Sequence, residues 1–253
     1  MINPYIIAHR GESHIAPENT LSSINMAWTN NADAVEIDIR LTKDNKIAVI
    51  HDPHTFRVSG KFKWVRNSLF KDLKKMDVGK YKGENYLEER IPELCEVLKT
   101  VPLNKKIIVE IKSGQRIIPY LKDALFSSGL KENQVEIISF SLKTLIEVKK
   151  IMPQFTVLWI LSLDYYWLKK FFCPSFDRII SKTSKNNIEG LNLWSGKMLN
   201  NQAIQRIKSA NLKLYAWTVN NQKKAEELFS MGVDGIITDR AGWLKNQLKK
   251  NSK

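Results

Sequence analysis

Short apolar runs alternate with stretches of helical periodicity along nearly the whole chain. The apolar runs are almost uninterrupted, which is typical of parallel strands buried on both faces. They predict nine strands, at Tyr5–His9, Val35–Ile39, Ile47–His51, Ile107–Ile111, Val135–Phe140, Thr156–Leu161, Ile188–Trp194, Leu212–Val219 and Gly235–Thr238. Apolar residues at helical spacing predict helices at Thr20–Asn30, Ile91–Thr100, Ile118–Ser127, Leu142–Ile151, Asn201–Ala210 and Gln222–Met231. This alternation predicts βα units around a parallel sheet.

The second and third predicted strands are joined by too few residues for a crossover helix, so they are expected to form an antiparallel hairpin. A two-residue turn at Asp44-Asn45 would place Asp38 directly opposite His51, with Cβ atoms about 5 Å apart. A slip of one residue would move His51 to the other face. Since a closed barrel needs eight strands, either the third strand is an added ribbon or the backbone around the second strand is distorted.

A chain of 253 residues is long enough for one α/β barrel. We therefore expect residues 1–253 to form a single domain, a distorted (β/α)8 TIM barrel. Residues 53–90 separate the hairpin from the next βα unit and predict a small insertion after the second βα region. Pro92 is expected in the first turn of the helix that follows.

Composition changes this picture little, because 43% hydrophobic and 26% charged residues are ordinary for a globular protein. The formal net charge of +14 is unusual, but the lysines are dispersed and no nucleic-acid-binding motif accompanies them. The charge predicts either a solvated lysine-rich surface or attraction to an anionic substrate or membrane surface. No nucleic-acid partner is expected.

The chain has no run of about 18 apolar residues, so stable membrane insertion is not expected, while peripheral membrane contact stays open. The first residues lack the charged region, apolar segment and cleavage site of a signal peptide. Cys95 and Cys173 have no metal-ligand or redox spacing and are interpreted as free thiols. These features predict a cytoplasmic protein.

Polar and ionisable residues gather where the predicted strands end. They include His9, Glu36, Asp38, His51, Glu110, Lys112, Trp217 and Asp239. Glu36 and Asp38 are two residues apart, so both carboxylates point to the same face of their strand. Because the active sites of α/β barrels lie at the carboxyl ends of the strands, these side chains predict an active site there.

Each of these residues also has a structural interpretation. A lone histidine at a strand end is usually a satisfied structural residue, and Lys112 could serve only as the ion-pair partner of Glu110. Two histidines that share a patch with carboxylates favour a catalytic site instead. Clustered carboxylates repel one another without a cation, which favours a metal site.

These residues lie in motifs that resemble the glycerophosphodiester phosphodiesterase family. The motifs follow one another in order over nearly the whole chain: AHRG at Ala8–Gly11, APENT at Ala16–Thr20, VEIDIRLTKDNKIAVIHD at Val35–Asp52, VEIK at Val109–Lys112, YAWTVN at Tyr215–Asn220 and GVDGIITDR at Gly232–Arg240. The segment Leu69–Leu98 also resembles the inserted region of the family and its exit helix. Residues from Thr156 to Leu199 match only loosely, which leaves the preferred alcohol group open.

The resemblance implies a distorted (β/α)8 barrel and metal-dependent hydrolysis of glycerophosphodiesters to sn-glycerol 3-phosphate and an alcohol. Carried over by position, the resemblance implies metal ligands at Glu36, Asp38 and Glu110. It implies an acid–base pair at His9 and His51 and phosphate contacts at Arg10 and Lys112. It also implies that Trp217 contacts the glycerol side of the substrate. Glu18 is expected to orient Arg10.

Oxygen-only ligation suits one divalent cation, Mg²⁺ or Ca²⁺, rather than zinc. Histidine titrates near neutral pH, so one imidazole can act as base while the other acts as acid. His9 is interpreted as the base, acting on water or on the substrate's own glycerol hydroxyl, and His51 as the acid. The reverse assignment stays open.

The expected substrate is a small-molecule glycerophosphodiester such as glycerophosphocholine or glycerophosphoethanolamine. The alternative is a lysophospholipase D-type phosphodiesterase that acts on lysophospholipids. The aromatic stretch Leu163–Cys173 bears on this choice, because it predicts either a helix packed on the barrel or a lid or membrane-facing patch. A non-catalytic barrel that binds phosphate esters would lack a ligand or a histidine, and none is missing from the motifs.

Overall fold

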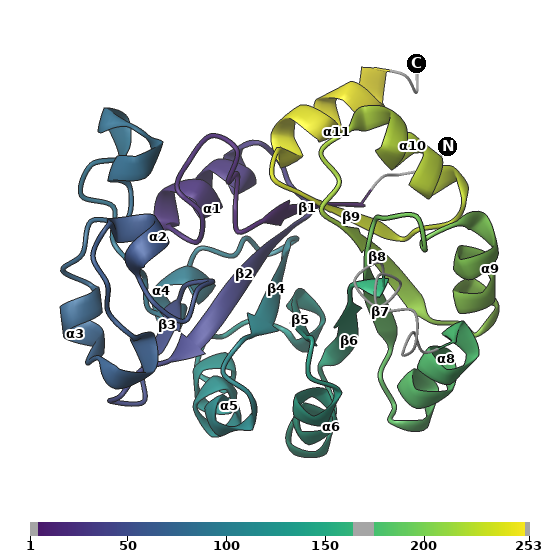
Figure 1. Cartoon of the computed structure of the whole chain (residues 1–253), viewed down its shortest axis with the longest axis horizontal. Helices are drawn as coiled ribbons and strands as arrows, with labels where there is room; N and C mark the ends of the chain where they lie inside the picture. Colours follow the sequence, from purple (N-terminus) through teal and green to yellow (C-terminus); the bar gives the residue numbers. More distant parts are fainter. Residues whose placement is uncertain (1–4, 164–174, 251–253) are drawn as a thin grey trace.

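The structure, a computed structural model, describes residues 5–163 and 175–250. Within these residues, eight parallel strands close into a barrel with helices packed on its outside, which confirms the predicted TIM barrel (Figure 1). The barrel closes where β1 pairs with both β2 and β9. In barrel order the strands are β1 Tyr5–His9, β2 Ala34–Leu41, β4 Lys106–Ile111, β5 Val135–Ser139, β6 Thr156–Leu161, β7 Gly190–Trp194, β8 Lys213–Trp217 and β9 Gly235–Thr238.

The strand β3, Ile47–Val49, is an antiparallel ribbon added to the end of β2, as one of the two alternatives predicted. Its register was predicted wrongly by one residue: Ile39 pairs with Val49, and the Ile50 amide, rather than His51, lies against the Asp38 carbonyl. The physical reason is the turn. Thr42 N donates to Lys46 O at 2.9 Å, and Asn45 at φ 60° completes a three-residue loop instead of a two-residue one.

Between β3 and β4 the chain forms short helical turns beside the barrel, on the left of Figure 1. They are α2 Phe56–Ser59, η1 Val65–Asn67, α3 Phe70–Leu73, η2 Lys80–Lys82, η3 Glu84–Tyr86 and α4 Leu94–Leu98. Their buried side chains form a separate apolar cluster with Ala48 and Ile50. The segment therefore packs on the outer side of the β3 ribbon.

The placement of Pro92 in a first helical turn was wrong, because α4 begins at Leu94 with Glu93 as its N-cap. The Val49 amide donates to the Pro92 carbonyl at 3.0 Å, and Ala48 forms a β-bridge with Glu93. Residues 92 and 93 are thus held along β3 in extended form, and the helix cannot begin before them.

Five of the six predicted helices are present with ends shifted by no more than one residue: α1 Leu21–Thr29, α5 Ile118–Phe126, α6 Leu142–Ile151, α9 Asn201–Ser209 and α10 Gln222–Ser230. The sixth, predicted at Ile91–Thr100, is shorter and forms α4. Thr20 caps α1 by accepting a hydrogen bond from Ser23 N. Two further helices, α8 Phe176–Lys185 and α11 Ala241–Lys250, were not predicted, because they are rich in lysine and polar residues.

The barrel interior is layered along its axis. Its middle part is apolar and is formed by one cluster, which includes Ile7, Ala34, Ile108, Ile138, Leu158, Ile160, Tyr215 and Ile237. Because side chains alternate along a strand, residues two positions further along face the same interior. His9, Glu36 and Glu110 occupy those positions at the carboxyl ends, so the interior changes there from apolar to ionisable.

Glu136 forms a charged layer at the opposite, amino-terminal end of the interior. It is 1% exposed, and its Oε1 lies 3.0 Å from Lys106 Nζ and 2.9 Å from Lys213 Nζ. Tyr215 OH donates to Oε2 at 2.9 Å. Burial opposes ionisation, but Lys213 and Lys106 outweigh it and lower the pKa of Glu136 below its ordinary value. This end of the barrel is therefore a structural ion cluster.

Glu136→Gln is expected to lower the free energy of unfolding by roughly 2–3 kcal/mol, because it leaves two partly exposed lysines without their carboxylate. A depressed folded-state pKa stabilises the protein above the ordinary pKa of 4.5. The loss of unfolding free energy in the variant should therefore be largest at pH 7. It should shrink as the pH falls through the lowered pKa of Glu136 in the folded protein. Urea unfolding at several pH values measures this, with Glu147→Gln on the surface of α6 as control; equal midpoints at pH 7 would contradict it.

None of the described helices is long and apolar enough to cross a membrane. Cys95 is exposed and has a free thiol, whereas Cys173 lies outside the described residues. The predicted aromatic stretch Leu163–Cys173 also lies outside them, except for buried Leu163.

Candidate active site

Strand register brings the predicted acidic residues together at the carboxyl end of the barrel. His9 on β1 pairs with Glu36 on β2, and Asp38 pairs with Glu110 on β4. The three carboxylates are buried, with exposed fractions of 2% for Glu36, 0% for Asp38 and 7% for Glu110. Parallel pairing thus places side chains from three strands within one layer.

The layer opens into a cavity of about 90 Å³. It is lined by His9, Arg10, Glu36, His51, Glu110, Lys112, Ile138, Phe140, Ile160, Asn192, Trp217 and Ile237. The structure therefore gathers the site residues expected from the sequence around one cavity. Asp38 lies beside it, in contact with Arg10 and Lys112.

Ligand oxygens of Glu36, Asp38 and Glu110 lie within 4.8 Å of one another. Glu36 Oε1 is buried and accepts no hydrogen bond. Burial, Asp38 and Glu110 raise the pKa of Glu36 well above its ordinary value, and burial with Asp38 raises the pKa of Glu110 to about 7. A divalent cation would relieve both effects, since carboxylate oxygens are its preferred ligands. The donor set fits such an ion.

Two cations border the carboxylates. Arg10 Nε lies 3.1 Å from Asp38 Oδ2, and the Arg10 amide donates to Glu36 Oε2 at 3.1 Å. Lys112 Nζ lies 3.2 Å from Asp38 Oδ1 and 2.5 Å from Glu110 Oε1. Burial opposes ionisation of Asp38, but Lys112 and Arg10 outweigh it and lower its pKa. Both cations also line the cavity, where an anionic ligand could reach them.

The turn after His9 holds Arg10 over the carboxylates. Arg10 has φ 56° and Gly11 φ 84°. A Cβ on Gly11 would lie 2.5 Å from the Ser23 carbonyl carbon, so only glycine fits where this turn packs on α1.

His9 is oriented by a carboxylate from the far end of the chain. Its Nδ1 lies 2.7 Å from Asp239 Oδ1, and Asp239 also accepts hydrogen bonds from Ser13 Oγ and Asn220 Nδ2. Burial opposes ionisation of Asp239, but the hydrogen bond from His9 helps to lower its pKa to about 2. The carboxylate thus keeps a proton on Nδ1 and leaves Nε2 as the basic nitrogen.

Residues 9–243 match the Glycerophosphoryl diester phosphodiesterase family. The chain belongs to this family. It is 33% identical to YhdW of Bacillus subtilis, over 93% of the chain and 94% of that protein. It is 30% identical to the glycerophosphodiester phosphodiesterase of Caldanaerobacter subterraneus, over 97% of the chain and 98% of that protein. The predicted family and enzyme class, a phosphoric diester hydrolase, are therefore confirmed.

A solved structure of an Oleispira antarctica phosphodiesterase, in complex with the product sn-glycerol-3-phosphate, has the same fold. Its TM-score to this chain is 0.85, with 24% sequence identity and 97% of each chain covered. Glycerophosphoryl diester phosphodiesterases depend on divalent metals, and the carboxylate cluster of this member could hold one.

His51 lies at one end of a series of side chains with alternating charges. His51 Nδ1 lies 2.7 Å from Asp52 Oδ1, and Arg57 Nε lies 2.6 Å from Asp52 Oδ2. Arg57 also contacts both oxygens of Glu18, at 2.6 and 2.8 Å. Glu18 in turn accepts from Arg10 NH1 at 2.9 Å, which confirms the expected contact between them. The series thus links His51 to the cation that binds Asp38.

Three residues that orient the site were not predicted to do so. Asn19 holds Asp38 on both sides, donating to Oδ2 at 2.9 Å and accepting from its amide at 3.1 Å. Arg57 comes from α2, inside the segment interpreted as an insertion. Asp239 is recognisable from the strand pattern only as a polar residue at the end of a strand. Asn19 and Asp239 lie within the family motifs, which could have identified them as site residues. Arg57 lies in none of the motifs.

Trp217 on β8 forms the cavity wall across the barrel from β4. Its ring centroid lies 5.2 Å from that of Trp194 and 5.7 Å from that of Phe140. Its Nε1 donates to Asn192 O at 3.2 Å. The indole is therefore fixed as an apolar surface opposite Lys112.

Proposed function

We propose that this protein hydrolyses glycerophosphodiesters to sn-glycerol 3-phosphate and an alcohol, with a divalent cation bound by Glu36, Asp38 and Glu110. One observation carries the proposal: two histidines, each with Nδ1 against a carboxylate, line one cavity together with the carboxylate cluster. The arrangement supplies two proton-transfer groups beside a cation site, which is what cleavage of a phosphodiester requires.

A phosphodiester is an anion that repels nucleophiles, and its alkoxide leaving group is poor. A bound divalent cation would stabilise the negative charge that develops on the non-bridging oxygens. Arg10 and Lys112 line the same cavity and add fixed positive charge for the phosphate. The rigid Trp217 wall suits the glycerol side of the substrate.

His9 acts as the base in this proposal. Its Nε2 takes the proton of the attacking hydroxyl while a new P–O bond forms. Attack by water gives sn-glycerol 3-phosphate directly, whereas attack by the substrate's own glycerol hydroxyl gives a cyclic phosphate that water then hydrolyses to it. His51 gives a proton to the departing alcohol oxygen as the old P–O bond breaks. Burial, with Arg10 and Lys112, lowers the pKa of His51 in the free protein, and an anionic substrate beside the ring would favour its charged form again.

We propose Mg²⁺ or Ca²⁺ as the ion, because the available ligands are carboxylate oxygens. We also propose a small-molecule glycerophosphodiester, rather than a lysophospholipid, as the substrate. Support comes from a relative that is 30% identical over nearly the whole chain and is named for glycerophosphodiesters.

A substrate panel tests the function. The protein is incubated with Mg²⁺ or Ca²⁺ and with glycerophosphocholine, glycerophosphoethanolamine, glycerophosphoglycerol or lysophosphatidylcholine, and sn-glycerol 3-phosphate and the released alcohol are quantified. Glycerol 3-phosphate from the water-soluble diesters is the expected result. If lysophosphatidylcholine is the only member hydrolysed, the proposed substrate class is wrong. If no member of the panel is hydrolysed, the proposed function is wrong.

Arg57→Gln is expected to lower kcat by about 10–100-fold, the usual cost of removing a group that orients a catalytic one. Without the guanidinium, Asp52 loses the partner that fixes it against His51. The loss should be larger for a substrate with a poor leaving alcohol than for an activated one, because the affected proton goes to the leaving group. Arg178→Gln, on the exposed face of α8, is the control. Equal losses on both substrates would show that Arg57 does not act through His51.

A further inference from the structure

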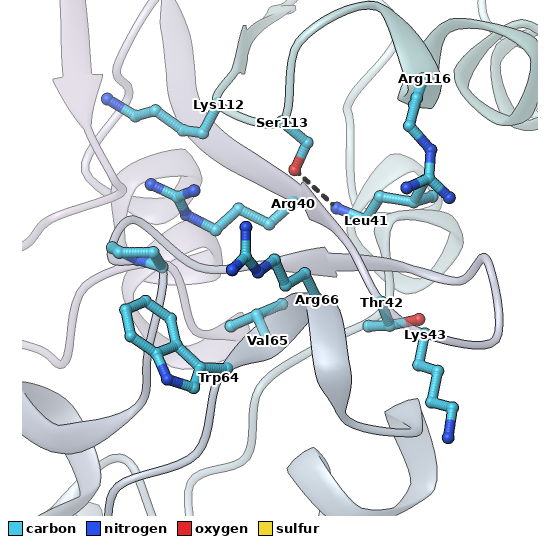
Figure 2. Close-up of a pocket in the computed structure, with 11 residues that line it drawn as sticks. Arg40, Leu41, Thr42, Lys43, Trp64, Val65, Arg66, Lys112, Ser113 and Arg116 are labelled. Carbon is cyan, nitrogen blue, oxygen red and sulfur yellow. Dashed lines mark hydrogen bonds between the residues drawn. The ribbon is translucent and has the colours of Figure 1, made fainter.

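A second cavity, of about 630 Å³, adjoins the candidate active site (Figure 2). We call it the basic groove, because its charged lining residues are Arg40, Lys43, Arg66, Lys112 and Arg116. Lys112 also lines the catalytic cavity, so the two cavities share a wall residue. The groove is built by the ends of β2 and β4 together with η1 of the 53–90 segment.

Among the described residues, no carboxylate lines this groove. No carboxylate of the described chain lies within 4.0 Å of a side-chain nitrogen of Arg40, Lys43, Arg66 or Arg116. By contrast, Arg10 and Arg57 are fully engaged in ion pairs. Several unpaired cations in one concavity repel one another, and an anion would relieve that repulsion.

Arg40 and Arg66 are the best placed of these cations. Arg40 Nε donates to the His51 carbonyl at 2.7 Å, which leaves its two terminal nitrogens for another partner. Burial lowers the pKa of Arg40, which marks a partly desolvated guanidinium. The Arg66 guanidinium carbon lies 5.7 Å from the Trp64 ring centroid. Figure 2 shows Arg40 and Arg66 extending from two different segments toward the same side of the groove, with the Trp64 ring beneath.

The groove lies on the side from which the leaving alcohol would depart. Trp217, the proposed glycerol contact, is across the barrel on β8, whereas Lys112 follows β4. His51, the proposed acid, is bound through its carbonyl to Arg40. A diester with its glycerol against Trp217 would therefore have His51, Lys112 and the groove on the side of its alcohol group.

We propose that the basic groove binds a second phosphate group carried by the leaving alcohol. The inference rests on the proposed function, and it names the substrate class as diesters of glycerol 3-phosphate whose alcohol bears a further phosphate. Arginine matches phosphate geometry with paired donors, and a groove of unpaired cations disfavours cationic alcohols such as choline.

The test compares two substrates that differ by one group: sn-glycero-3-phosphoglycerol, and the same diester with a phosphate monoester on the leaving glycerol. The wild-type protein should have kcat/KM for the phosphorylated substrate higher by about 10-fold, the scale of one charge-assisted contact. The double variant Arg66→Gln/Arg116→Gln should lower this ratio toward one, and Arg178→Gln should keep it. Arg66 and Arg116 are exposed, and thermal unfolding checks that the variants remain folded.

A ratio near one in the wild type, with clear hydrolysis of the diester that lacks the extra phosphate, would overturn the groove assignment and leave the proposed function standing. A ratio that the double variant keeps would also overturn it. If inorganic phosphate stimulates hydrolysis of the diester that lacks the extra phosphate, the groove is a separate effector site and the assignment is overturned. Hydrolysis of neither substrate would overturn the proposed function itself.

Discussion

Replacing His9 or His51 by alanine is expected to lower kcat for sn-glycero-3-phosphoethanolamine by about 10²–10⁴, the usual contribution of a general acid or base. Both rings line the cavity, and both are held by a carboxylate on Nδ1. Without the His9 ring, the attacking hydroxyl has no acceptor for its proton. Without the His51 ring, the departing alkoxide has no proton donor. The exposed His14 provides the matched control, and His14→Ala should keep near-normal turnover. Steady-state release of glycerol 3-phosphate measures all three variants.

A substrate with an activated leaving group separates the two roles. A glycerophosphodiester of p-nitrophenol needs little protonation of its leaving oxygen, so His51→Ala should lose far less activity on it than on the ethanolamine diester. His9→Ala should lose similar activity on both, because the attacking hydroxyl still needs a base. The opposite pattern would exchange the roles of the two histidines. Near-normal turnover of either variant on the ethanolamine diester would remove that histidine from the mechanism.

Glu36→Gln is expected to weaken divalent-cation binding by roughly 100-fold or more, beyond the 10–100-fold typical of groups that only orient a ligand. Glu36 is buried, its Oε1 has no other partner, and its pKa is raised by burial and by the two neighbouring carboxylates. The neutral amide is a weaker ligand for Mg²⁺ or Ca²⁺ than a carboxylate. Isothermal titration calorimetry with each ion measures the affinity without reference to turnover.

Glu147→Gln on the surface of α6 is the control for this prediction, because it removes the same charge far from the site. Its cation affinity should equal that of the wild type. Unchanged binding in Glu36→Gln would show that the carboxylate cluster is not the cation site. Thermal unfolding of the ion-free proteins checks that any difference does not reflect a loss of fold.

Most of the fold follows from local patterns in the sequence. Strands such as Tyr5–His9 and Thr156–Leu161 have the predicted ends, because buried parallel strands are marked by uninterrupted apolar runs. The β2–β3 register does not follow, because it depends on whether Asn45 adopts a left-handed conformation and extends the turn to three residues. The polar helix α8 buries only Ile179 and Thr183, so its apolar face was too narrow to recognise.

In the candidate site, too, some features follow from local sequence patterns and others depend on tertiary contacts. The positions of Glu36, Asp38 and Glu110 depend on alternation along strands, which a sequence displays directly. The partners of the histidines depend on tertiary contacts: Asp239 reaches His9 across 230 residues of chain, and Arg57 joins Asp52 to Glu18 from within a segment of irregular turns. The basic groove likewise combines β2, β4 and η1, and no local pattern reports that they meet.

Removal and return of the cation would show whether this fold performs metal-dependent hydrolysis of a glycerophosphodiester. The protein is stripped with chelator, and release of glycerol 3-phosphate from sn-glycero-3-phosphoglycerol is followed as Mg²⁺ or Ca²⁺ is added back. Release should fall to background in chelator and return as one of these ions saturates the site. Full release in excess chelator would contradict the account.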